Sequence, residues 1–171
     1  RQFGSMIELH DISRLGNELA HDSNIRGYAS AGARPSLDQR SYSMKHRKPL
    51  EASEYLHKNP QAVLIDCRSE MEYLFVGHPI GALHVAWNDG PDWDINPHFV
   101  GQVKKVASMN RPVVLICRSG QRSIAAGVEL EKAGFAEVYN VLGGFEGPLD
   151  DEHHRGTIGG WRKEGLPWEQ T

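Results

Sequence analysis

The chain has 171 residues, of which 39% are hydrophobic, 24% charged and 8% aromatic. This composition is that of an ordinary globular protein and excludes wholesale disorder, collagen and coiled coil. Its 19 Lys and Arg residues against 22 Asp and Glu residues give a net charge of −3, which supplies no general attraction to nucleic acid or to an anionic membrane. We therefore expect neither kind of partner, and any anion site must be local.

No run of apolar residues approaches the roughly 18 that a membrane-spanning helix needs, and the N-terminus lacks the apolar core of a secretory signal. The chain has only 2 cysteines, which gives no disulfide framework. These features predict a cytoplasmic protein, although a leader removed before residue 1 would leave no trace.

The pattern divides the chain into an N-terminal extension, 1–49, and a domain, 50–171. Residues 1–5 resemble a cloning scar ahead of Met6. Apolar residues recur at helical spacing through 6–20, which predicts a short amphipathic helix, and a mixture of Gly, Pro, Ser and Lys predicts a linker over 22–49. The helix could pack on the domain or join two subunits in a dimer, so the sequence leaves the oligomeric state open.

After Pro49 apolar runs alternate with segments of helical period. The predicted helices are 50–58, 69–76, 99–107 and 123–133, and the predicted strands are 62–65, 82–86, 112–116 and 137–141. Ser69 and Glu72 have the spacing of a capping box, and Gly, Pro and Asp predict a loop over 88–97. Alternating strands and helices imply right-handed βαβ units, so we expect an α/β fold with a parallel sheet and helices on both faces.

The segment that carries chemistry follows the most apolar predicted strand and precedes a helix. It reads Cys117-Arg118-Ser119-Gly120-Gln121-Arg122-Ser123. In a parallel α/β sheet this position lies beyond the carboxyl end of the strand, where functional loops gather. A cysteine there meets backbone N–H groups, the positive end of a helix dipole and two guanidinium groups, which all favour thiolate over thiol. The sequence therefore predicts that Cys117 is a nucleophile beside an anion site.

This loop resembles the active-site loop of the rhodanese family of sulfurtransferases. Other motifs of that family follow in the same order along the domain. They are Asp66-Cys67-Arg68 with Glu72-Tyr73, the turn at 77–84, Leu142-Gly143-Gly144-Phe145, and Trp161 with Gly165-Leu166-Pro167. The chain departs from the family at Cys67, where Val is usual, and in the turn, where Pro79 and Ile80 are exchanged.

The resemblance implies a five-stranded parallel sheet and a double-displacement cycle. In this cycle Cys117 takes the outer sulfur of thiosulfate or a similar small sulfur-containing anion, and the resulting persulfide passes it to cyanide or a thiol. The resemblance gives Cys117 the catalytic role and gives substrate binding to Arg118, Ser119, Gly120, Gln121, Arg122 and Ser123. Asp66 and Arg68 are expected to be structural. We expect no cofactor, and no metal, because no cysteine accompanies the adjacent His153 and His154.

Two alternatives remain open. A cysteine phosphatase or arsenate reductase of related fold has an Arg six positions after the Cys, where this chain has Ser123 and an Arg one residue earlier. A rhodanese-like module could also carry sulfur or regulate a partner protein without efficient turnover. Cys67 follows a strand expected beside that of Cys117 and could resolve or accept sulfur, but a small apolar substitute for Val is the simpler interpretation. The physiological donor, acceptor and pathway are not readable from the sequence.

Overall fold

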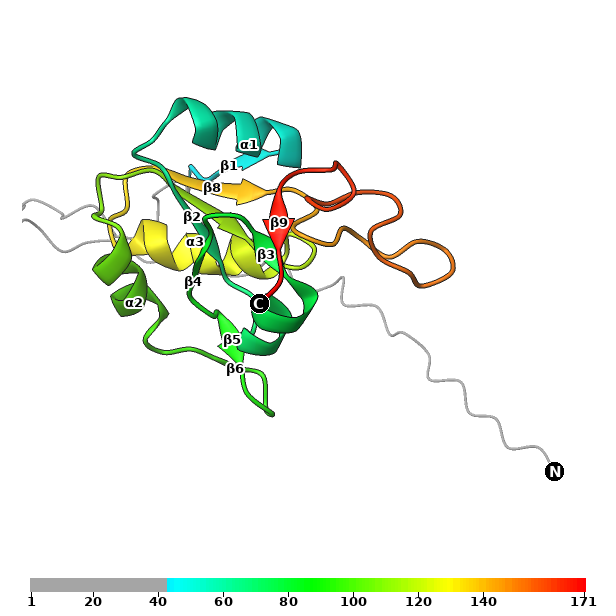
Figure 1. Ribbon diagram of the computed structural model, residues 1–171. Helices are drawn as coiled ribbons and strands as arrows, with labels where there is room; N and C mark the ends of the chain where they lie inside the picture. Colours follow the sequence, from blue (N-terminus) through cyan, green and yellow to red (C-terminus); the bar gives the residue numbers. More distant parts are fainter. Residues whose placement is uncertain (1–42) are drawn as a thin grey trace, which may run out of the picture. The chain divides into compact units, whose positions relative to one another are not determined.

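The computed structural model describes residues 43–171, so the predicted helix at 6–20 and most of the predicted linker lie outside the described residues. A five-stranded parallel sheet in the order β1-β8-β7-β2-β4 forms the centre of the domain (Figure 1). Its strands are β1 (Lys45–Arg47), β2 (Val63–Asp66), β4 (Leu83–His84), β7 (Val113–Ile116) and β8 (Val138–Val141). The helices are α1 (Pro49–Lys58), a π-helical turn η1 (Glu72–Val76), α2 (Phe99–Val106) and α3 (Arg122–Lys132). The predicted fold class is confirmed.

Helices cover both faces of the sheet because side chains along its central strands alternate between them. All four residues of β7 are buried. Val113 and Leu115 pack in the core cluster that contains α2 and α3, whereas Val114 and Ile116 pack in the cluster that contains α1. This two-sided burial is the reason that the strand is continuously apolar, and it fixes the position of the loop that follows it. Within residues 43–171 no helix is long and apolar enough to cross a membrane.

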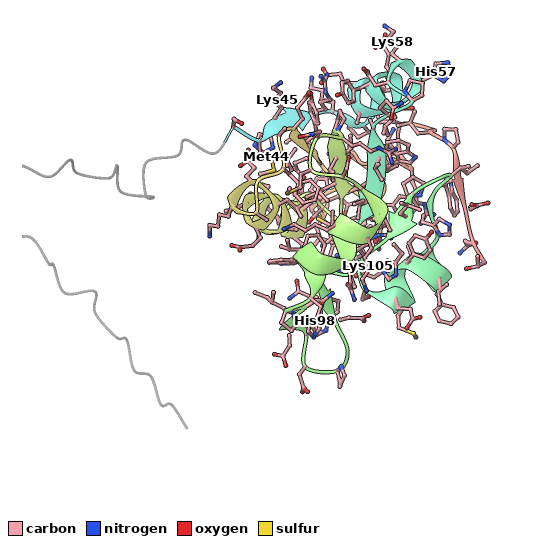
Figure 2. The ribbon with its side chains drawn as sticks, turned by 90° about the vertical axis from the view of Figure 1, so that its left-hand side faces the viewer. Met44, Lys45, His57, Lys58, His98 and Lys105 are labelled. Atoms are coloured by element: carbon pink, nitrogen blue, oxygen red, sulfur yellow. The ribbon has the colours of Figure 1, made fainter. Side chains whose placement is uncertain are left out.

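The end of the predicted linker forms the edge strand β1, contrary to the expectation of a loop through residue 49. Its three residues pair in parallel with 139–141 of β8. Met44, which leads into this strand (Figure 2), packs against the core cluster beside α3. The sequence Lys-His-Arg lacks the apolar alternation of a half-buried strand, so pairing with β8 rather than a local pattern determines its structure. The sheet therefore begins before residue 50.

The ends of the other predicted helices and strands lie within one residue of the observed ends. The structure differs from the prediction in three further respects. The capping box of Ser69 and Glu72 forms, but the helix it opens is short and widens into η1 before Gly77 ends it at a φ of 92°. The predicted strand at 82–86 is reduced to β4 at the sheet edge. Two antiparallel pairs were not expected: β5 (Asn88–Asp89) with β6 (Asp94–Ile95), and β3 (His78–Pro79) with β9 (Trp168–Glu169). Pairs of two residues are too short for a sequence period to show them.

A glycine after β8, Gly144, supports the loop that follows β7. Gly144 has a φ of +60°, and a Cβ at this position would overlap the carbonyl oxygen of Cys117. The next two amides hold the loop directly, because Phe145 N donates to Cys117 O at 2.7 Å and Glu146 N donates to Arg118 O at 2.9 Å. Close approach of the two backbones therefore requires glycine at position 144.

We expect Gly144→Ala to destabilise the domain by about 3 kcal/mol or more, because left-handed strain adds to a clash with the backbone. Gly156→Ala is the matched control, since Gly156 has a φ of +76° but no atom within 4 Å of the Cβ position. The control should lose only about 1–2 kcal/mol. Urea unfolding midpoints measure both, and equal losses would show that the contact with the loop is unimportant.

Candidate active site

The sulfur of Cys117 is buried at the carboxyl end of β7. This strand lies between β8 and β2, and the chain turns from Cys117 into α3 within four residues. The residue is 1% exposed and belongs to the core cluster on the α3 face of the sheet. The structure thus brings the predicted nucleophile to the edge of the sheet where functional loops gather, but inside the protein rather than on its surface.

Two donors of the loop point at this sulfur. The backbone N–H of Gly120 donates to Cys117 Sγ at 3.1 Å, and Ser123 Oγ lies 3.2 Å from the same sulfur. Gly120 has a φ of +90°, a conformation that turns its amide inward and that other residues rarely adopt. Curled amides of this kind form a cradle for an anion, so the loop suits a thiolate and an added sulfur atom.

Cys67 is a third partner of the sulfur. It follows β2, whose Asp66 pairs with Ile116 of β7, and Cys67 N donates to Ile116 O at 2.8 Å. Its thiol has a single proton, which can be donated to the carbonyl of Ile116 at 3.2 Å or to the sulfur of Cys117. Cys67 therefore differs from the small apolar substitute that the sequence favours, because its thiol can donate to Cys117 and lower the pKa of that sulfur.

These contacts hold the pKa of Cys117 at about 5, well below the usual range of a cysteine thiol. The hydrogen bond from Cys67 contributes most, burial acts in the opposite direction, and the side chain and amide of Ser123 and the amide of Ser119 lower the pKa further. Burial and the neighbouring Cys117 raise the pKa of Cys67. At neutral pH the pair therefore consists of a thiolate at Cys117 and a thiol at Cys67.

The two predicted arginines differ in their surroundings. Arg122 forms a bidentate pair with Glu72, with nitrogen to oxygen distances of 2.8 and 2.7 Å. Burial raises the pKa of Glu72, but Arg122 and the donors of Ser69 outweigh it and lower the pKa to about 2. The side chain of Arg118 is 47% exposed, and its Nε lies 4.0 Å from Glu72 Oε1. Arg118 is therefore the arginine that can reach an incoming anion, while Arg122 ties the loop to η1.

Gln121 and the two residues expected to be structural, Asp66 and Arg68, lie around the loop or at the end of β2. Gln121 is exposed, whereas the sulfur is buried, and its backbone carbonyl accepts from Ile124 N at 3.1 Å. Arg68 and Asp66 form a fully buried ion pair at 2.6 Å, and Arg68 also donates to the carbonyl of Gly77. Through Gly77, which follows η1, this pair ties the end of η1 to the end of β2.

Two polar residues at the site, the partly buried Glu72 and the buried Asn140, were not predicted as functional. Glu72 was assigned to the capping box and to a family motif without a role at the site, yet it also binds Arg122. Asn140 is 0% exposed, and its Oδ1 lies 2.6 Å from Ser123 Oγ. The signal for Asn140 is present in the sequence, because an amide interrupts the otherwise apolar face of a strand expected to be buried.

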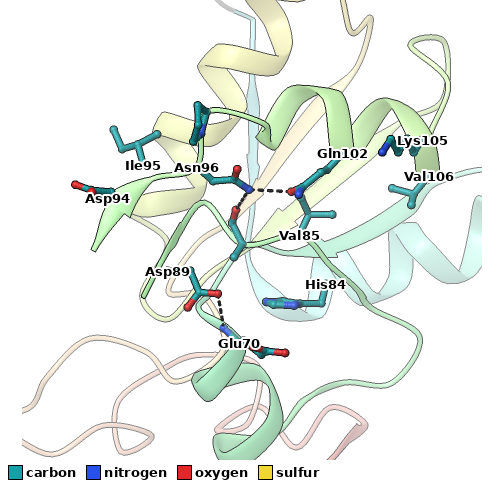
Figure 3. A pocket seen from close by; sticks show the side chains of 12 residues that line it. Glu70, His84, Val85, Asp89, Asp94, Ile95, Asn96, Gln102, Lys105 and Val106 are labelled. Carbon is teal, nitrogen blue, oxygen red and sulfur yellow. Dashed lines mark hydrogen bonds between the residues drawn. The ribbon is translucent and has the colours of Figure 1, made fainter. Parts of the chain in front are cut away.

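A cavity of about 640 Å³ lies away from the loop, between the edge strand β4 and α2 (Figure 3). Glu70, His84, Gln102 and Lys105 contribute to its wall, and no residue of the loop lines it. Among residues 43–171, no group of three or more metal-ligating side chains is placed to hold a metal ion. The buried sulfur and its donors, rather than a large cavity, mark the candidate site.

The fold and the loop together define a class of protein, an α/β domain with a buried cysteine thiolate at the end of a central strand. Residues 48–149 match the family model of the rhodanese-like domain, and the chain belongs to this family of sulfurtransferases.

The chain is also similar to several individual proteins. Thiosulfate sulfurtransferase GlpE of Pseudomonas putida is 32% identical over 58% of this chain and 81% of its own length. An uncharacterized protein of Rickettsia conorii is 29% identical over 70% of this chain and 92% of its own. The crystal structure of Rv0390 from M. tuberculosis superposes with a TM-score of 0.68 and 43% identity, covering 77% of this chain and 100% of that one.

We expect Cys67→Val to raise the pKa of Cys117 from about 5 by roughly one unit, because it removes the strongest hydrogen bond to the thiolate. Ultraviolet absorbance of the thiolate against pH measures the change. Cys67→Ala is a second variant without the bulk of Val, and Cys117→Ala should lose the acidic transition. An unchanged midpoint in both Cys67 variants would contradict the role of this thiol.

Proposed function

We propose that the protein is a sulfurtransferase that moves sulfane sulfur from thiosulfate, or a similar anionic donor, to cyanide or a thiol through a persulfide on Cys117. The observation that carries this proposal is the buried Cys117 sulfur, with a pKa of about 5 and an inward-facing amide at 3.1 Å. The 32% identity to a curated thiosulfate sulfurtransferase supports the choice of donor.

In the first step the Cys117 thiolate attacks the outer sulfur of thiosulfate. A sulfur–sulfur bond forms to Cys117, the bond between the two sulfurs of thiosulfate breaks, and its electron pair leaves with sulfite. The amide of Gly120 and the hydroxyl of Ser123 stay beside the new persulfide, where they can stabilise its negative charge.

In the second step a thiophile attacks the outer sulfur of the persulfide. Cyanide is thereby converted to thiocyanate, or a thiolate to a new persulfide. The bond between the two sulfurs of the Cys117 persulfide breaks, and its electron pair returns to Cys117 as the thiolate. The low pKa of Cys117 favours this step, because a thiolate of low pKa is the better leaving group. Release of the first product before the second substrate reacts predicts ping-pong kinetics.

The experiment is intact-mass measurement after incubation with thiosulfate, together with an assay for thiocyanate. The wild type should gain the mass of one sulfur atom and turn over with cyanide, and Cys117→Ala should do neither. A persulfide without turnover would favour the sulfur-carrying module. No gain in mass with any sulfane donor would overturn the proposal and make phosphatase and arsenate reductase substrates the next tests.

We expect Arg118→Ala to raise the KM for thiosulfate about tenfold with a smaller change in kcat, because a charge-assisted hydrogen bond to the donor is lost. Arg111→Ala is the matched control. It removes the same charge at the amino end of β7, where Arg111 donates to the carbonyl of Gln61. Equal effects of the two variants would indicate long-range charge rather than binding by Arg118.

A further inference from the structure

A continuous chain of side-chain contacts connects the Cys117 sulfur with the edge of the sheet. Ser123 Oγ lies 3.2 Å from the sulfur and 2.6 Å from Asn140 Oδ1. Asn140 Nδ2 lies 3.1 Å from Nδ1 of His46 on the neighbouring strand β1, where the two residues are paired in register. Ser123 and Asn140 are fully buried, whereas His46 is exposed. This series of side-chain contacts therefore links the reactive sulfur to an imidazole that is exposed to solvent.

The hydroxyl of Ser123 has a single proton and two acceptors. It can donate to Asn140 Oδ1 or to the thiolate, but not fully to both. With Asn140 Nδ2 donating to an unprotonated Nδ1 of His46, the amide oxygen faces Ser123 and competes for that proton. The thiolate then depends more heavily on Gly120 and Cys67.

A proton on Nδ1 of His46 reverses the direction of the hydrogen bonds from His46 to Asn140 and from Asn140 to Ser123. Nδ1 then donates, so the amide of Asn140 must turn its oxygen toward His46 and its NH₂ toward Ser123. Ser123 Oγ accepts from that NH₂, and its own proton is directed to the sulfur of Cys117. Imidazolium always carries this proton, whereas neutral imidazole can place its single proton on the other nitrogen.

We propose that His46 and Asn140 are positioning residues that decide whether Ser123 donates to the Cys117 thiolate. When His46 is protonated, Ser123 donates to the thiolate. We call His46, Asn140 and Ser123 the relay. This inference deepens the proposed function, because it concerns the same thiolate. In the donating direction the hydroxyl of Ser123 adds a hydrogen bond to the thiolate, which favours the deprotonated form of Cys117.

Neighbouring charges have other partners in the described part of the chain. On β1 itself, Lys45 lies 5.5 Å from the centre of the Tyr139 ring and Arg47 lies 4.9 Å from it, on the opposite face of the sheet from Asn140. On α3, Glu131 accepts from the amide and hydroxyl of Ser43, and Arg122 is paired with Glu72. Asn140 is therefore the route by which the charge state of His46 reaches Cys117.

The test is the rate at which iodoacetamide alkylates Cys117 between about pH 4 and pH 8. His46→Ala should slow alkylation about fivefold at pH 5, as expected for a pKa raised by about one unit, and leave the rate at pH 8 unchanged. His57→Ala is the matched control, since His57 is an exposed residue on α1, on the other face of the sheet (Figure 2). Its profile should follow the wild type.

A double-mutant cycle separates a relay from a local effect of His46. Asn140→Leu removes the amide that transmits the change, so His46→Ala should have no further effect on the pH profile in that background. Superimposable profiles of wild type and His46→Ala, or an equal slowing at every pH, would overturn the relay. The same holds if His46→Ala retains its full effect in the Asn140→Leu protein.

Alkylation requires no sulfur donor, so the two proposals can fail independently. A shifted alkylation profile without a persulfide would retain the relay and reject the sulfurtransferase. Persulfide formation with unshifted alkylation profiles would retain the sulfurtransferase and reject the relay.

Discussion

The structure depends on how a negatively charged sulfur is held where water has little access. Cys117 is 1% exposed, and a buried charge is costly unless hydrogen bonds replace its hydration. The parallel sheet supplies those bonds, because the carboxyl ends of its central strands meet at one edge. Cys67 follows one neighbouring strand, Asn140 lies in the other, and the loop amides come from the turn into α3. The donors to the sulfur are therefore positioned by the end of β2 and by the turn into α3, and Asn140 contacts one of them, Ser123.

Positive charge at the site is largely balanced by Glu72. With a pKa of about 2, this carboxylate remains charged throughout the range in which Cys117, with a pKa of about 5, takes up its proton. Its bidentate pair with Arg122 therefore persists while the thiolate titrates, and it joins η1 to the start of α3. The half-exposed Arg118 remains as the cation that can meet a donor.

The sequence predicts the fold and the position of the nucleophile because both depend on local patterns. Continuous apolar runs locate the buried strands, and a cysteine between such a run and a helix locates the loop. The roles of Cys67, Glu72 and Asn140 depend instead on contacts between segments 17 to 50 residues apart, which no local pattern encodes. For the same reason β1 is missed, since its three polar residues become a strand through their pairing with β8.

The low pKa of Cys117 has opposite effects on the two steps of the proposed cycle. A thiolate stabilised by several hydrogen bonds is a weaker nucleophile toward the donor but a better leaving group when the thiophile attacks the persulfide. A hydroxyl that can direct its proton toward Asn140 or toward the sulfur reduces this conflict. Turned away, it leaves the thiolate more reactive for the first step; turned toward the sulfur, it stabilises the charge that returns in the second. The hydrogen bonds of Ser123 are therefore the place where the fold can adjust the chemistry without moving its backbone.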